Sequence, residues 1–194
     1  MGWRTATPRG GQANLAMMAM VRTLPAMSRF LLPTLALLLV ACDSRQPAPA
    51  GPVRELGLET RFPVRVGVVL TQLRVAATDL EKARGLMGVT RLAEAEGMAF
   101  MYDAEARMGF WMKSTPLDLD IAFVARDGTV LEIRTMSAGD TETTTSLSDR
   151  ARFAVEMRAG WFRDFGVKPG DKVNVEDLRV ALRARGFDAG KFLP

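Results

Sequence analysis

Residues 121–136 read Ile-Ala-Phe-Val-Ala-Arg-Asp-Gly-Thr-Val-Leu-Glu-Ile-Arg-Thr-Met, and this stretch decides the fold. It consists of two apolar runs, 121–126 and 129–136, on either side of Asp127-Gly128, a dipeptide that favours a two-residue type I′ hairpin turn. In that register the apolar side chains divide between two faces, with Ala122, Val124, Leu131 and Ile133 on one and Ile121, Phe123, Ala125 and Val130 on the other. Because both faces are largely apolar, we expect the hairpin to lie centrally in a layered β structure.

The residues before the hairpin predict further strands and one short helix. Residues 64–76 are rich in β-branched side chains and fit two short strands joined by a bend. Thr78-Asp79-Leu80-Glu81 is a capping box, so a helix should run from Asp79 to Arg84. Two apolar stretches, 98–102 and 107–113, are expected to be strands.

The residues after the hairpin predict one more strand, two turns and a final helix. A polar loop at 135–152 precedes an alternating strand at 153–157 and a helical turn at 160–165. Lys168-Pro169-Gly170-Asp171 has the residues of a type II turn. A last helix should span 175–185 and rest on the edge of the domain, because its apolar stripe is narrow.

Together these elements predict a mainly β (α+β) fold. We expect a small barrel-like or sandwich domain that carries two or three short helices. The domain should span residues 61–174, and the C-terminal helix and tail should occupy 175–194. A chain of this length forms one compact domain.

Five ordered sequence blocks carry a resemblance to a known family. The blocks are Ala83-Arg84-Gly85-Leu86-Met87-Gly88, Glu96-Gly97-Met98-Ala99-Phe100, Phe110-Trp111-Met112-Lys113-Ser114-Thr115, Leu119-Asp120-Ile121-Ala122-Phe123 and Ala159-Gly160-Trp161. Over about residues 64–174 the chain resembles the bacterial and archaeal domain-of-unknown-function family 192. The resemblance implies a small, mainly β domain that is often exported or lipid-anchored, and it implies no agreed biochemical activity.

The chain departs from the pattern of that family in three places. Ser114 stands where the family usually has Asn, and Asp118 stands near a position that is usually Pro. The loop at 137–150 is rich in Thr and Ser and lacks the cysteines and prolines that many relatives carry there. If that loop holds a ligand in the family, this chain need not hold it in the same way.

The densest polar constellation in the chain is the candidate ligand-binding site, and it consists of Trp111, Lys113, Thr115, Asp118 and Asp120. A carboxylate at the rim of an apolar face is costly unless it is paired, and Lys113 is the natural partner of Asp120. One interpretation is purely structural, with an ion pair or a turn-capping Asp. A second makes Trp111 a stacking platform for a small molecule or glycan. A third uses Asp118 and Asp120 as the acid and base of a hydrolase.

Other polar and soft side chains have simpler interpretations. We expect Glu156 to form a cross-strand surface pair with Arg134 or Arg158. Arg84 and Arg91 are expected to be solvated charges, with lining a site as the alternative. The scattered methionines are expected to fill the core rather than to bind a metal; they are Met87, Met98, Met101, Met108 and Met112.

The N-terminal segment predicts export and lipidation. Residues 30–41 form an apolar run behind Arg22 and Arg29, which fits a signal peptide and is too short to span a bilayer. Leu39-Val40-Ala41-Cys42 resembles the bacterial lipobox, in which the cysteine is lipidated and the chain is cut before it. We therefore expect a signal peptide at 1–41, with Met20 as a possible true start, and a flexible Pro-rich linker at 42–60. The mature protein should be extracytoplasmic, anchored to a bacterial membrane through lipid on Cys42.

Composition narrows the chemistry further. The chain has no His, and its one Cys should be lipidated, which excludes Ser-His-Asp and Cys-His nucleophile systems and zinc or haem sites built on His or Cys. An oxygen-ligated Ca²⁺ or Mg²⁺ stays open, although no loop has the acidic spacing of an EF-hand. Four of the 26 basic residues precede Cys42, which leaves 22 basic and 22 acidic residues in the mature chain. Without a basic field we expect no nucleic-acid partner. We expect no cofactor and assign no catalytic residue.

These observations favour a non-enzymatic envelope lipoprotein that binds a small molecule or glycan. A carboxylate-dependent hydrolase of envelope polymers is the contrasting hypothesis. A structural or partner-binding lipoprotein is the third.

Overall fold

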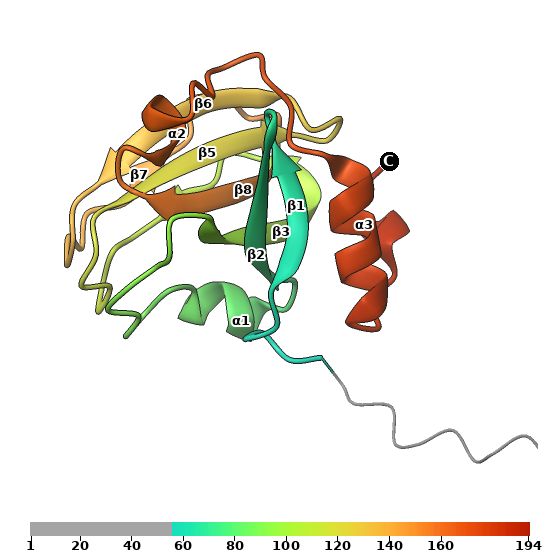
Figure 1. Cartoon of the computed structure of the whole chain (residues 1–194), viewed down its shortest axis with the longest axis horizontal. Coiled ribbons are helices and arrows are strands. Elements are labelled where there is room, and N and C mark those ends of the chain that lie inside the picture. The colour runs from blue at the N-terminus through green and yellow to red at the C-terminus, as the bar shows by residue number, and fades with distance from the viewer. Residues whose placement is uncertain (1–55) are drawn as a thin grey trace, which may run out of the picture. The chain divides into compact units, whose positions relative to one another are not determined.

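Six strands form one mixed sheet in a computed structural model of the chain, which describes residues 56–194 (Figure 1). In spatial order they are β1 (Phe62–Val66), β2 (Val69–Ala76), β3 (Glu96–Ala106), β8 (Ala151–Arg158), β5 (Leu119–Ala125) and β6 (Val130–Met136). Strands β2 and β3 run parallel, and the other neighbouring pairs are antiparallel. The mainly β, α+β fold is confirmed. The predicted signal peptide, Cys42 and most of the linker lie outside the described residues.

The sheet is open, so the predicted barrel-like or sandwich arrangement is wrong in detail. Strands β6, β5 and β8 run across the view of Figure 1, whereas β1 and β2 run nearly vertically, and the edge strands β6 and β1 do not pair with each other. The segment 171–174 lies between the two edges instead. Its Lys172 carbonyl accepts from the amide of Gly67 beside β1, while the Asp171 carbonyl accepts from the amide of Val130 in β6, each at 2.8 Å. One irregular segment thus occupies the place where a closing strand would lie.

The central hairpin is present, but its turn is not type I′. The Gly128 amide donates to the Ala125 carbonyl and the Ala125 amide donates to the Thr129 carbonyl, which leaves three residues in the loop. A type I′ turn needs positive φ at both central residues, whereas here only Gly128 has it, at 86°. This is the three-residue loop with a glycine in the left-handed region.

An irregularity in the β5–β6 pairing moves two side chains to the face opposite the predicted one. Phe123 faces Glu132 in the predicted register, but Val124 then faces Val130 instead of Leu131. Val130 therefore packs in the core with Val124, and Leu131 packs on the other face of the sheet. The extra residue of a β-bulge changes the side-chain alternation in this way.

The short strands β4 (Gly109–Phe110) and β7 (Thr144–Thr145) pair with each other outside the main sheet. The strand predicted over 107–113 is therefore wrong for most of its length. Only Gly109 and Phe110 pair with another strand, because β7 in the polar loop opposite them is only two residues long. The remainder is a loop, fixed for instance by the Met112 amide, which donates to the Asp140 carbonyl at 2.8 Å.

Within residues 56–194, three helices lie where the sequence predicted helical segments. Helix α1 (Asp79–Arg84) has the complete Thr78/Glu81 capping box. A single turn, α2 (Trp161–Asp164), follows β8, and α3 (Val175–Ala184) is followed by the 3₁₀ turn η1 (Ala189–Lys191). The turn at 168–171 closes with the Asp171 amide donating to the Lys168 carbonyl, and Gly170 has the positive φ that a type II turn requires.

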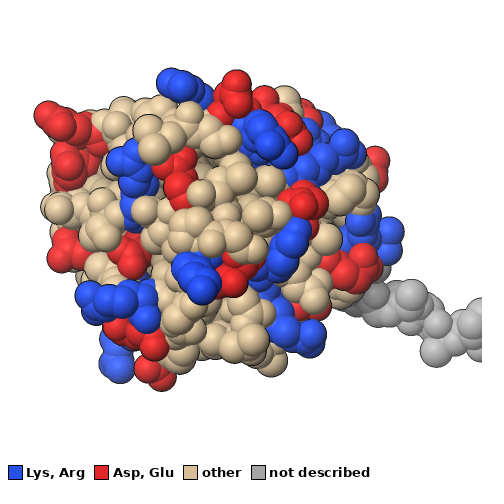
Figure 2. All heavy atoms as spheres, turned by 90° about the horizontal axis from the view of Figure 1, so that it is seen from above, with Lys and Arg blue, Asp and Glu red and all other residues tan. Residues whose placement is uncertain are grey.

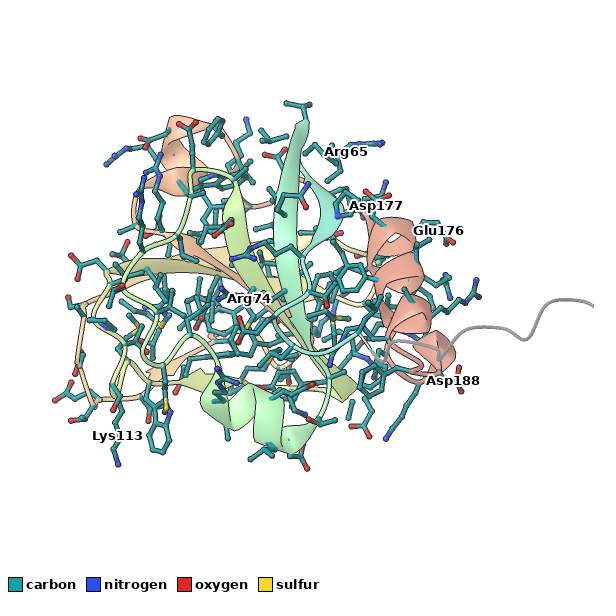
Figure 3. All side chains as sticks on the ribbon, turned by 60° about the horizontal axis from the view of Figure 1, so that its bottom comes forward. Arg65, Arg74, Lys113, Glu176, Asp177 and Asp188 are labelled. Carbon is teal, nitrogen blue, oxygen red and sulfur yellow. The ribbon has the colours of Figure 1, made fainter. Side chains whose placement is uncertain are left out.

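Helix α3 is more deeply buried than its narrow apolar stripe suggested. Leu178, Ala181 and Leu182 have no exposed surface, and the helix packs against β1 and β2 (Figure 1). The carboxylate of Asp177 accepts from the backbone amide of Arg65 in β1 at 2.9 Å, which joins helix and strand (Figure 3). None of the helices within residues 56–194 has the length and hydrophobicity needed to cross a bilayer.

The sheet is covered on both faces. Trp161, Phe153 and the apolar side of α3 pack on one face, together with Val64, Val75, Val155 and Phe162. The other face carries Phe100, Phe110, Ile121, Phe123 and three of the five methionines, Met98, Met108 and Met112. Met101 packs on the first face, so four of the methionines fill the core as predicted. The central strands β3, β8 and β5 are therefore buried from both sides.

Candidate functional site

A hollow of about 290 Å³ lies between α1 and the face of the sheet that carries Phe100. Its walls come from three parts of the chain: α1 and the segment after it, β3 with β8, and the loop around β4. The lining residues are Asp79, Lys82, Ala83, Arg84, Gly85, Leu86, Met87, Phe100, Tyr102, Gly109, Phe110, Trp111, Thr115 and Glu156. The hollow thus combines aromatic and apolar side chains with about as much polar surface, which includes four charged side chains.

The sheet positions Glu156 within this hollow. Glu156 lies in β8 between Met98 of β3 and Ile121 of β5, both of them buried core residues. The strands approach closely there because Gly97 has no side chain; a Cβ at Gly97 would lie 2.3 Å from the Glu156 carbonyl oxygen. Glu156 therefore projects from the middle of the sheet rather than from its edge.

The carboxyl group of Glu156 is buried and has no partner among the described residues. The residue is 4% exposed, and no hydrogen bond or ion pair joins its side chain to another group in residues 56–194. Burial raises the pKa of Glu156 from 4.5 to about 8. The predicted surface pair with Arg134 or Arg158 is wrong, since Arg134 pairs with Glu132 and Arg158 pairs with Asp164.

Tyr102 and Lys82 form the wall beside Glu156. Burial raises the pKa of Tyr102 to about 12, and the nearby carboxylates of Glu156 and Asp79 add to the shift. The Lys82 ammonium lies 4.3 Å from the centre of the Tyr102 ring and 2.9 Å from the Asp79 carboxylate. Its charge is therefore shared between an aromatic face and a carboxylate at the rim.

Trp111 and Thr115 contribute to the hollow from the loop after β4. Trp111 is 52% exposed, so its ring is accessible to solvent. Thr115 is 5% exposed, and its hydroxyl forms no hydrogen bond to the rest of the described chain. Between them, Ser114 has a φ of 59°, and its carbonyl accepts from the Gly88 amide at 2.9 Å. This bond ties the loop to the segment that follows α1.

The other predicted site residues do not line the hollow. Lys113 points away from the domain (Figure 3), and its ammonium is 6.0 Å from the centre of the Trp111 ring. Asp118 is exposed and accepts from the Ala138 amide at 2.7 Å. Asp120 lies on the opposite face of the sheet, so the five residues predicted as one site are divided.

Asp120 stabilises the backbone instead of pairing with Lys113. Its two carboxylate oxygens accept from the Thr135 hydroxyl at 2.7 Å and from the Gly160 amide at 2.8 Å. These bonds hold the start of β5 to β6 and to the turn before α2. The interpretation of Asp120 as a turn-capping residue agrees with this geometry.

Comparison with known proteins places the chain in a family. Residues 63–175 match the model of DUF192, which is described only as "Uncharacterized ACR". The chain belongs to the DUF192 family. No curated protein matches it.

Two solved structures are similar to this DUF192 protein. A protein of unknown function from Novosphingobium aromaticivorans is 32% identical with a TM-score of 0.56, and the match covers 59% of this chain and 84% of that one. A protein from Sinorhizobium meliloti, provisionally described as a transcription regulator, is 26% identical with a TM-score of 0.55, and the match covers 59% of this chain and 91% of that one.

The sequence blocks that identified the DUF192 resemblance separate into two groups in space. The blocks that begin at Ala83, Glu96 and Phe110 all contribute to the hollow. The remaining two blocks meet each other through the bond between Asp120 and the Gly160 amide. Three blocks therefore surround a possible site, and two stabilise the fold.

Sequence reasoning missed Glu156, Tyr102 and Lys82. The sequence feature that could have indicated Glu156 is the position of residues 153–157. They form an alternating strand and follow a hairpin whose two faces are both apolar. A strand beside such a hairpin is covered on both sides, so a Glu within it is buried. Arg84 lines the rim of the hollow and pairs with Glu59 at 3.1 Å, whereas Arg91 is exposed.

Proposed function

We propose that this DUF192 protein binds a small molecule or glycan in the hollow beneath α1. The observation that carries the proposal is that Glu156 and Thr115 line the hollow and that neither side chain forms a hydrogen bond within residues 56–194. Their polar atoms are therefore available to a ligand in the hollow, and a hydrogen bond that replaces one to water contributes about 0.5–1.5 kcal/mol. The exposed ring of Trp111 adds a surface on which a sugar or another flat group can stack.

A thermal-shift screen of metabolites and glycans tests this proposal. A ligand present at 100 times its dissociation constant should stabilise the fold by about 2.7 kcal/mol. Trp111→Ala should weaken a ligand found in this way, and Leu147→Ala is the matched control because Leu147 is also exposed and lies outside the hollow. If no compound shifts the transition, or if Trp111→Ala leaves the affinity unchanged, the proposed site is wrong.

We also propose that the protein acts outside the cytoplasm, anchored to a bacterial membrane through lipid on Cys42. The lipobox-like Leu39-Val40-Ala41-Cys42 supports this address, and the Pro-rich residues that follow would serve as a spacer. Mass spectrometry of the purified protein should show a chain that begins at an acylated Cys42. Cys42→Ser should move the protein out of the membrane fraction. An unmodified thiol or unchanged membrane association of that variant would contradict the anchor.

A hydrolase is the second candidate function, and one observation favours it. A carboxyl group with a pKa near 8 in a hollow has the protonation state of a general acid. Glycoside hydrolysis also needs a second carboxylate, and the other acidic residue lining the hollow is Asp79, which is held by Lys82. Asp118 and Asp120, the pair considered from sequence, are bonded to backbone and hydroxyl groups elsewhere. Binding without turnover therefore remains the first proposal.

Transcription regulation, the provisional description of the Sinorhizobium meliloti protein, finds no support in the charges on the face that Figure 2 shows. The described residues carry basic and acidic side chains interspersed on the face that Figure 2 shows. DNA-binding proteins concentrate positive charge on one surface.

A purely structural or partner-binding lipoprotein remains the outcome if the ligand screen finds nothing.

A further inference from the structure

The unpaired Glu156 carboxyl is the feature of the hollow that best indicates the class of its ligand. It is buried between the side chains of two neighbouring strands, and no basic residue in 56–194 forms an ion pair with it. Burial is the cause that raises its pKa, with no lowering contribution from a nearby cation. The carboxyl group is therefore short of a positive partner.

The basic side chains around the hollow already have acidic partners. Lys82 pairs with Asp79 at 2.9 Å, and Arg84 pairs with Glu59 at 3.1 Å. The Nε atom of Arg74 in β2 (Figure 3) lies 3.3 Å from the carboxylate of the same Glu59. The two residues form an ion pair, although this Nε forms no hydrogen bond. When Glu156 ionises, a bound cation would supply the positive charge that no ion pair within residues 56–194 provides.

The walls of the hollow suit a positively charged group with apolar substituents. Phe100 and Phe110 pack edge to face with ring centres 5.1 Å apart, and Tyr102 lies 6.5 Å from Phe110. Ring faces attract ammonium groups, and the chain itself places the Lys82 ammonium over Tyr102. Aromatic walls around an unpaired carboxyl combine the two features by which proteins recognise organic cations.

We propose that the ligand of this hollow is a small organic cation, with an ammonium or quaternary ammonium group that pairs with Glu156 and alkyl groups that contact the aromatic walls. This inference rests on the proposed function, that the hollow binds a small molecule. The volume of the hollow, about 290 Å³, limits the ligand to a compact molecule.

Binding of such a cation should become tighter as the pH rises, because the cation binds the ionised form of Glu156. With a pKa of about 8, the ionised fraction of Glu156 rises from about 1% at pH 6 to about 90% at pH 9. The affinity should therefore rise about 90-fold between these pH values. The other titratable groups that line the hollow are Tyr102 on β3 and Asp79, Lys82 and Arg84 on α1. Tyr102, with a pKa of about 12, stays protonated over this range.

Two matched probes test the inference by calorimetry on the full-length protein. Choline carries a permanent positive charge, and 3,3-dimethyl-1-butanol has nearly the same shape without the charge. Choline should bind at least about tenfold more tightly than the alcohol at pH 9, because only choline pairs with the ionised Glu156. A tenfold difference in the dissociation constant corresponds to about 1.4 kcal/mol of binding free energy. Neither probe titrates, so the pH dependence of choline binding reports on the protein.

Glu156→Gln should abolish the preference for choline and remove the pH dependence. Glu132→Gln is the matched control, because Glu132 is a partly buried carboxylate of the same sheet that does not line the hollow. Equal affinity for both probes, or undiminished choline binding by Glu156→Gln, would overturn the inference. If uncharged compounds bind in the thermal-shift screen and choline does not, the hollow is a ligand site of another class. If neither kind binds, the proposed function falls as well.

Discussion

Replacing Glu156 by Gln should stabilise the protein at neutral pH, which is the reverse of the usual effect of changing a buried residue. In the folded protein the pKa of Glu156 is about 8, whereas the unfolded chain has the ordinary value of 4.5. Below pH 4.5 the carboxyl is protonated in both states. As the pH rises above 4.5 the unfolded chain releases its proton first, so the free energy of unfolding falls until the folded state also ionises near pH 8.

The size of this effect follows from the difference between the two pKa values. One unit corresponds to 1.36 kcal/mol, so Glu156 lowers the free energy of unfolding by about 3 kcal/mol at pH 7 and about 5 kcal/mol at pH 9, relative to acid pH. Gln has nearly the same shape and does not ionise. The variant should therefore be more stable than the parent by up to about 3 kcal/mol at pH 7, and nearly equal to it at pH 4.

Urea unfolding of the full-length protein at pH 4, 7 and 9 measures these differences. Other groups also titrate over this range, so the informative quantity is the difference between variant and parent at each pH. Glu132→Gln should lose stability, because it removes the negative charge that pairs with Arg134, and should gain nothing at high pH. A Glu156→Gln protein that is less stable than the parent at pH 7, or whose difference does not grow with pH, would refute the reasoning.

Three further predictions concern the free energy of unfolding of variants at residues away from Glu156. Asp120→Ala should cost about 1–2 kcal/mol in urea unfolding, because it leaves the half-buried Gly160 amide and the Thr135 hydroxyl without their acceptor, and should leave ligand affinity unchanged. Ser114→Asn should raise the free energy of unfolding by about 0.5–1 kcal/mol, since Asn tolerates the left-handed φ of 59° better, whereas Ser114→Val should lower it. Burial would raise the pKa of Glu81, but hydrogen bonds from Arg185 and two backbone amides lower it from 4.5 to about 2. The contribution of Glu81 to the free energy of unfolding is therefore complete above pH 4.5 and is lost as the pH falls toward 2. Glu81→Gln should remove this dependence, which amounts to up to about 3 kcal/mol, and acid unfolding followed by circular dichroism measures it.

Much of the fold could be predicted from the sequence because its signals are local. The alternation of residues 121–123 gave the correct pairing with β6, and the Thr78/Glu81 capping box gave the correct helix. The bulge after Phe123 could not be predicted, because both turn types use the same Asp-Gly dipeptide. The position of segment 171–174 between the two edges of the sheet could not be predicted either, because it depends on contacts distant in sequence.

The candidate site was predicted only in part, for a reason that lies in the topology. Trp111 and Thr115 do line the hollow, since they share a loop that the sequence marks as polar and aromatic. Glu156 was missed because strand β8 lies between β3 and β5, an arrangement that only the tertiary structure specifies. Asp120 was grouped with them by sequence distance, although strand alternation directs it to the opposite face.

The most direct test of the central claim is a carbon-13 NMR titration of the Glu156 side-chain carboxyl in the purified protein. If this carboxyl is buried in the hollow without a partner, its resonance should titrate with a pKa near 8 and should shift when a ligand binds. A resonance that titrates near 4.5 would show a solvated or paired carboxylate, and both the hollow as a ligand site and the cationic ligand would then be contradicted.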